Sequence, residues 1–106
     1  MTPESIRYGR RTTSSQQLVI VGTSSVTFLV SSPRRVAIIV SAPPTNRFTL
    51  SLQTTAVLDQ GINVYPTGQP LVLTIETHGD LVTRAWTAIS ATASQSVTVI
   101  EVFAEA

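Results

Sequence analysis

The chain has 106 residues, of which 42% are hydrophobic and 12% are charged, and its net charge is +1. This length predicts one domain with a single modest core, and a charge so near zero excludes a global field that would attract nucleic acid or an anionic membrane. The absence of cysteine excludes a disulfide framework and a thiolate site, and the absence of lysine excludes a Schiff-base nucleophile.

The first 15 residues are polar and basic and follow the period of neither a strand nor a helix. This composition predicts a flexible N-terminal arm over residues 1–15, with the folded domain over residues 16–106. The arm is either a frayed tail or a segment that orders on a neighbouring subunit, where Tyr8 would be the anchor and the arginines would pair with carboxylates or phosphates. These arginines are Arg7, Arg10 and Arg11.

Two short strands are expected at residues 18–21 and 26–30, and the longest apolar run follows at residues 34–41. This run is rich in β-branched residues, is bounded by prolines and is apolar on both faces. A half-exposed strand would alternate apolar with polar residues. The pattern therefore predicts a central strand that is covered on both sides.

The second half of the chain predicts further strands separated by turns. Alternation indicates strands at residues 47–52, 62–64 and 71–75, and His78-Gly79-Asp80 is typical of a hairpin loop. A return strand is expected at residues 81–90. The last strand, residues 97–103, changes parity between Val99 and Ile100, which indicates either a bulge or burial of both faces.

About eight short strands with turns every 8–12 residues predict an all-β fold, a single antiparallel β-sandwich with an extended N-terminal arm. Its connectivity is either jelly-roll-like or immunoglobulin-like, since both give the same pattern of short strands. No lysine is available to protect a sheet edge, so packing against other subunits is expected to protect it.

The order of these strands and turns resembles small β-sandwich virion proteins of tailed bacteriophages. The matching stretches begin with the arginine-led strand at residues 35–40 and include residues 60–68, with a Tyr-Pro-Thr-Gly turn, Trp86-Thr87-Ala88-Ile89 and residues 96–102. The resemblance covers roughly residues 25–103. It implies a capsid decoration or cement protein that self-associates, often as a trimer, and binds the major capsid protein or another virion protein. It implies neither catalysis nor a cofactor.

Composition agrees with a protein that has partners. The charged fraction is about half that of a typical soluble domain, which predicts that apolar surface is covered by a partner or by another copy. The sequence shows no signal peptide and no apolar run near the roughly 20 residues of a membrane helix. We therefore expect assembly in the host cytoplasm and a final place on the capsid surface of a virion.

Candidate interface residues outside the arm are arginines and aromatics. Arg34 and Arg35 stand at the start of the central strand, where one could be solvated and the other could bridge to a carboxylate of a neighbour. Trp86 is expected in the core, but if exposed it would make an interface hot spot. The main alternative function is that of a tail, neck or head-fibre accessory or a carbohydrate-binding module of a virion. In that case, exposed Trp86 and Tyr65 could form its sugar-binding end.

Catalysis and metal binding find little support in the sequence. His78 is the sole histidine, and no nucleophile lies in a pattern that would complete a triad with it and Asp80. Glu76, His78 and Asp80 alternate and could approach one another, but polar residues gather at turns for other reasons. The arm carries only a small basic patch, for which a protein surface is preferred over nucleic acid. We therefore expect a non-enzymatic protein with no metal and no cofactor.

Overall fold

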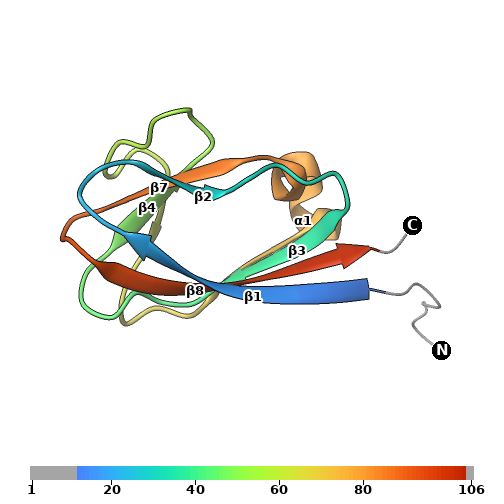
Figure 1. Cartoon of the computed structure of the whole chain (residues 1–106), viewed down its shortest axis with the longest axis horizontal. Helices are drawn as coiled ribbons and strands as arrows, with labels where there is room; N and C mark the ends of the chain where they lie inside the picture. Colours follow the sequence, from blue (N-terminus) through green and yellow to red (C-terminus); the bar gives the residue numbers. More distant parts are fainter. Residues whose placement is uncertain (1–11, 105–106) are drawn as a thin grey trace.

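Two four-stranded antiparallel sheets pack face to face in the computed structural model, which describes residues 12–104 (Figure 1). The predicted all-β sandwich is thereby confirmed. The strands are β1 (Thr12–Val21), β2 (Val26–Leu29), β3 (Arg35–Val40), β4 (Phe48–Ser51), β5 (Ile62–Val64), β6 (Leu71–Thr74), β7 (Trp86–Ser90) and β8 (Gln95–Ala104). A single-turn helix α1 (Ile75–His78) and a 3-10 helix η1 (Gly79–Thr83) lie between β6 and β7.

The order of the strands decides the connectivity that the sequence left open. One sheet has the order β1-β8-β3-β6 and the other β2-β7-β4-β5. The chain thus pairs its first strand with its last and its second with its seventh, continuing inward to the pair of β4 and β5. A long antiparallel hairpin wrapped in this way, with successive pairs alternating between two sheets, is a jelly roll.

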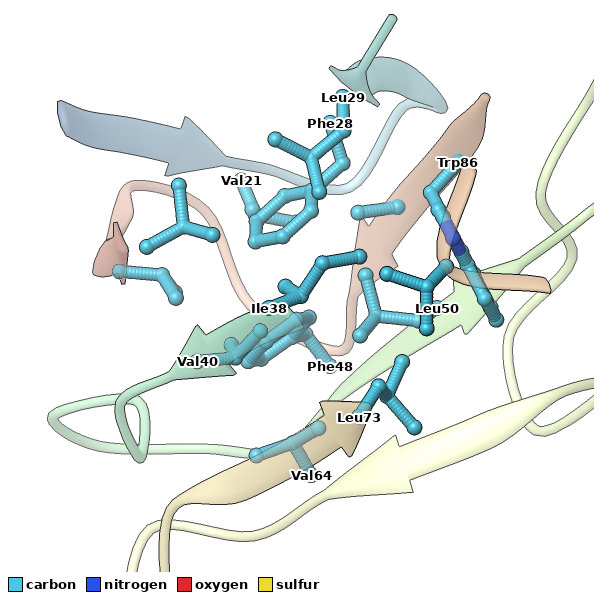
Figure 2. Close-up of a cluster of buried hydrophobic side chains, with 14 residues drawn as sticks. Val21, Phe28, Leu29, Ile38, Val40, Phe48, Leu50, Val64, Leu73 and Trp86 are labelled. Carbon is cyan, nitrogen blue, oxygen red and sulfur yellow. The ribbon is translucent and has the colours of Figure 1, made fainter. Parts of the chain in front are cut away.

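The core lies between the two sheets and is built from alternate residues of the strands (Figure 2). Phe28 from β2 and Phe48 from β4 lie 5.9 Å apart between ring centroids. Opposite them, Ile38 and Val40 of β3 point inward from the other sheet and are fully buried. Because large apolar groups from both sheets share this space, their burial is the main stabilising contribution.

Strand β3 is internal to its sheet, between β8 and β6, but only one of its faces is covered by a second layer. Ile38 and Val40 are buried, whereas Ala37 and Ile39 are half-buried. The prediction that both faces are covered is therefore wrong. A two-layer sandwich gives each sheet only one inner face, and the apolar residues on the other face have no layer above them in the described structure.

The predicted arm and the first strand divide at a different residue. Strand β1 begins at Thr12, so residues 12–15 belong to the sheet and not to an arm. They pair with β8 from Thr12 opposite Ala104 to Ser15 opposite Glu101. Backbone hydrogen bonds form this ladder whatever the side chains are, which is why a polar segment gave no strand signal. Residues 1–11, including Arg7, Tyr8, Arg10 and Arg11, lie outside the described residues.

The segment predicted as a hairpin loop at residues 78–80 instead connects the two sheets. It falls in α1 and η1, between β6 of one sheet and β7 of the other. The side chain of Thr74 accepts a hydrogen bond from the Thr77 N–H and caps α1. The return strand accordingly begins at Trp86 and not at residue 81.

Candidate interaction surfaces

The outer side of the sheet β1-β8-β3-β6 carries an apolar patch with members on all four strands and with Gln16, Thr98 and Ser96 among them. Ile39 of β3 lies opposite Val72 of β6 on one side and opposite Ile100 of β8 on the other. On β1, Leu18 and Ile20 share this side and are 62% and 52% exposed. We call the patch the outer apolar face; its members are Leu18, Ile20, Ile39, Val72, Ile100 and Val102.

The low charge of the chain predicted some apolar surface, but not which residues form it. Val72 is 49% exposed, whereas its neighbour Leu73 on β6 is buried. For β8, the sequence indicated either a bulge near Ile100 or burial of both faces, and the register with β1 runs without interruption from Thr12 to Val21. Ile100 is only half-buried, so neither alternative holds. The apparent change of parity arises because Ile100 and Val102 are apolar residues on an outward-facing side.

The irregularity in this sheet lies in β3, where it turns Arg35 inward. The register with β8 shifts between Arg35, which is opposite Phe103, and Ala37, which is opposite Val102. A bulge places two residues of one strand against one of the other and reverses the alternation. Arg35 therefore points to the same side as Ile38 and is 0% exposed.

The buried guanidinium of Arg35 joins elements from both sheets. It donates to the Glu101 carboxylate at 2.7 Å, and to the carbonyls of Val30, Val82 and Arg84 at 3.0, 2.7 and 2.7 Å. Such charge-assisted bonds make the rigid fork of arginine well suited to a buried site. The prediction of Arg35 as an interface residue is thus corrected, because its charge is satisfied inside the domain.

The other candidate interface residues lie apart from one another. Arg34 is exposed, and its carbonyl accepts a hydrogen bond from the Ala104 N–H at 2.8 Å. Trp86 is buried and donates from Nε1 to the Leu81 carbonyl at 3.2 Å, which agrees with its expected place in the core. Tyr65 is exposed and directly follows β5, at the end of the sheet where β7 ends with Ser90. Trp86 begins β7 four residues earlier, toward the other end of this sheet. The two aromatics therefore form no common platform for a sugar.

The outer side of the second sheet is covered by residues 52–61 and by a polar network that the sequence did not reveal. Arg47 donates from Nε and Nη2 to both carboxylate oxygens of Asp59 at 2.8 Å. Asn63 donates to Asp59 at 3.0 Å, and the Thr49 hydroxyl bonds both Asn63 and the Asp59 N–H. Gly61 closes the segment against β4, where a Cβ atom would meet the Leu50 carbonyl oxygen. The sequence had marked residues 59–61 only as a turn.

This network shifts the pKa of both charged members. The hydrogen bond from Arg47 is the main cause that lowers the pKa of the Asp59 carboxyl below its ordinary value. The same bond raises the pKa of Arg47. Asp59 also holds a left-handed backbone with φ of 66°, a conformation that Asp and Asn tolerate better than most residues. The network therefore fixes a turn, and its groups are occupied with one another.

No catalytic arrangement emerges in residues 12–104. His78 Nδ1 accepts a hydrogen bond from the Thr74 N–H at 3.1 Å, which gives the ring a structural role beside α1. A shallow groove of about 250 Å³ runs beside Leu50, Gln60 and Trp86, and no titratable side chain lines it. The described residues contain no group of three or more His, Cys, Asp or Glu placed to hold a metal. Within the same range, every helix is too short to cross a membrane.

Comparison with known proteins places the fold but no family. No family model matches the sequence, and no curated protein matches it. Among solved structures, the chain is similar to one from Bacillus endospore appendages, described as a novel family of disulfide-linked pili. The TM-score is 0.53 at 7% identity, over 92% of this chain and 91% of that one. A likeness at this identity shows a shared fold across nearly the whole domain.

Proposed function

We propose that this protein is a non-enzymatic structural subunit that binds the surface of a larger protein assembly through the outer apolar face. The observation that carries the proposal is the solvent exposure of Leu18, Ile20 and Val72 on the outer side of one sheet. A soluble domain with few charges gains stability by covering such a patch. The resemblance of the sequence to phage virion proteins favours a capsid as the assembly and its major capsid protein as the partner.

The energetics of such a subunit suit a lattice. One outer apolar face is small, and each contact would be weak by itself. A lattice offers many equivalent sites, and a subunit that touches two neighbouring capsid proteins stabilises both by mass action. Arg7, Tyr8, Arg10 and Arg11 would add polar contacts with a neighbouring subunit, as the resemblance implies. The protein would thereby act as a cement on the outside of the shell.

Binding to capsid shells tests this proposal directly. Shells assembled from a phage major capsid protein, the proposed partner, are mixed with the purified protein and sedimented. We expect Val72→Lys to abolish co-sedimentation, since it places a charge within an apolar contact that excludes water. Val57→Lys, at an equally exposed position in the segment over the other sheet, is the matched control and should bind like the wild type. Equal binding of all three proteins would contradict the proposal.

Removal of residues 1–11 tests the arm separately. We expect weaker shell binding with an unchanged urea-unfolding midpoint, because the truncated chain keeps all of β1, Thr12–Val21. Undiminished affinity of the truncated chain would exclude the arm from the contact while leaving the outer apolar face as the binding surface.

A second candidate is the subunit of a homopolymeric fibre, favoured by the likeness to a pilus chain over almost the full length of both. The covalent link of those pili cannot be reproduced, because this chain has no cysteine. Fibre growth would need a head-to-tail contact between two different surfaces. Negative-stain electron microscopy of the concentrated protein separates the two candidates: fibres without shells support the second, and dispersed particles support the first.

A further inference from the structure

The four outermost strands of the two sheets differ greatly in length. The edges are β1 and β6 in one sheet and β2 and β5 in the other. Three of them have only three or four residues, whereas β1 has ten. Very short strands are a common protection of a sheet edge. Strand β1 lacks this protection.

Among the described residues, the chemistry of β1 also lacks the charges, prolines and bulges that protect other sheet edges. Residues 12–21 contain no charged residue, no proline and no glycine. The register with β8 shows no bulge that would twist the edge away. β6, by contrast, is preceded by Pro70, and β2 has an irregular register near Thr27. A long, uncharged, regular edge presents a row of unpaired N–H and C=O groups that favours pairing with another strand.

We propose that β1 pairs antiparallel with β1 of a second copy, which joins two β1-β8-β3-β6 sheets into one continuous eight-stranded sheet. The length of the edge selects this occupant, because another copy of β1 is the only edge among residues 12–104 that can match it. The lack of charge supports the same choice, since the two-fold axis brings the residues at the centre of the strand next to their own copies, where like charges would repel. The pairing is isologous and closes as a two-fold dimer.

The geometry of a continuous sheet restricts the register. A two-fold axis perpendicular to the sheet keeps the outer sides of both copies together, so opposed residues must share the same side of the strand. The numbers of opposed residues then sum to an even value. Centring the pair on Leu18 sets Leu18 against its copy and Ile20 against Gln16 of the second copy. Both outer apolar faces then merge into one surface across the joint.

The proposed dimer goes beyond the proposed shell binding, and either proposal can fail while the other holds. Its contact is the free edge of β1, whereas the proposed contact with a shell is the outer apolar face, which extends to Val72 at the opposite edge of the sheet. It also differs from the trimer that the resemblance implies. A closed pair in this register uses residues 15–21 of the β1 edge and leaves the merged outer face available to a partner.

Disulfide trapping tests the register, because the natural chain has no cysteine to compete. Opposed residues of antiparallel strands have Cα atoms about 4.5–5.5 Å apart, within the range that a disulfide spans. We expect Leu18→Cys to form a covalent dimer under mild oxidation. Val72→Cys, also exposed but on the far edge strand β6, is the control and should remain monomeric on a denaturing gel. Cross-linking of Val72→Cys alone would overturn the proposed joint.

A charge swap tests the interface in solution by light scattering. The wild type should have twice the 11.3 kDa mass of the chain. Leu18→Lys should be monomeric with an unchanged circular dichroism spectrum, because the side chain is already exposed and two lysines would face each other across the axis. Mixing Leu18→Lys with Leu18→Glu should restore the dimer, and Val72→Lys should dimerise like the wild type.

A measured mass other than that of the dimer overturns the proposal, and each such result has its own meaning. A monomeric wild type excludes the pair, and a trimer favours the symmetry of the resembled family. A full chain that is monomeric but dimerises after removal of residues 1–11 would assign the edge to its own N-terminal segment. Failure of Leu18→Lys plus Leu18→Glu to associate would show that the edge does not mediate the dimer. Shell binding by Val57→Lys and loss of it by Val72→Lys would stand in all these cases.

Discussion

The outer sides of the two sheets have opposite characters. Over the sheet β2-β7-β4-β5, polar side chains are buried: Thr49 is 0% exposed and Ser51 is 4% exposed. Over the sheet β1-β8-β3-β6, large apolar side chains are exposed, led by Leu18 and Ile20. The usual distribution of polar and apolar residues between surface and interior is thus reversed on both sides of the molecule.

The difference teaches what kind of cover each side requires. Residues 52–61, which lie over the sheet β2-β7-β4-β5, bring backbone N–H and C=O groups that must be hydrogen-bonded. Polar residues such as Thr49 and Asn63 are therefore suitable beneath them. The Thr49 hydroxyl, for example, accepts from the Asp59 N–H at 2.9 Å. Within residues 12–104 the apolar side has no such loop. One side is thus covered by the chain itself, and the other is the side that we propose is covered by a partner.

The largest effect on stability is predicted for a substitution at Arg35, whose side chain links the two sheets. Arg35→Met should lower the free energy of unfolding by about 3–5 kcal/mol, because Glu101 is left as a buried unpaired charge. Three carbonyls from the connections near β2 and β7 also lose their donor. Urea unfolding of the full chain measures the loss, with exposed Arg34→Met as the control that should change stability little.

The partner substitution shows whether the charge itself is responsible. Arg35→Met combined with Glu101→Leu should be more stable than Arg35→Met alone, since replacing both members of a buried pair by apolar residues is often neutral. If the double variant is no more stable, then the carbonyl hydrogen bonds of Arg35 hold the sheets together and the ion pair is secondary.

The next effect concerns the covered side, where Gly61 touches β4. Gly61→Ala should destabilise the protein by about 1–3 kcal/mol, the usual range for inserting a group into a closely packed site. A Cβ there meets the Leu50 carbonyl oxygen and the Thr49 methyl group. Gly22→Ala is the matched control, because the nearest atom to its Cβ is 4.0 Å away. Equal thermal midpoints for both variants would mean that the backbone around Gly61 moves away from β4 without loss of stability.

A smaller effect, dependent on pH, comes from the Arg47–Asp59 ion pair on the same side. The folded pKa of Asp59 is lowered, so its contribution to stability is present above the ordinary carboxyl range and is lost as pH falls through the folded pKa. Asp59→Asn keeps the left-handed backbone but removes the charge. Its unfolding midpoint should lie below that of the wild type at pH 7, and the gap should narrow below about pH 4. A gap independent of pH would contradict a role for the charge.

The smallest effect on stability should come from the open side. Val72→Thr should change the free energy of unfolding by less than about 0.5 kcal/mol, as for other exposed positions, because the side chain already faces water. The same change should still weaken binding to a shell, since the contact loses apolar area. Stability is measured by urea unfolding and binding by co-sedimentation. A large loss of stability would show that the outer apolar face is part of the core.

Local patterns in the sequence were sufficient for the strands with clear alternation. The all-β class, the internal position of β3 and the inward side of β4 follow from β-branched runs and from Phe48 and Leu50. These signals are visible because one side of each strand packs against the core, so a period of two is imposed on the sequence. The polar start of β1 carries no such signal, since only its backbone pairs with β8.

The candidate surfaces were less predictable because they join residues that are distant in the sequence. Low charge predicted an apolar surface, but only the strand order brings Leu18, Ile39, Val72 and Ile100 together on one side. The inward turn of Arg35 depends on a bulge, and the Arg47–Asp59 pair depends on a loop that folds back over β4. The sequence by itself determined a sandwich with apolar surface to cover. The tertiary structure alone decided the jelly-roll order, the burial of Arg35 and the side that stays open, because non-local pairing sets which strands become neighbours.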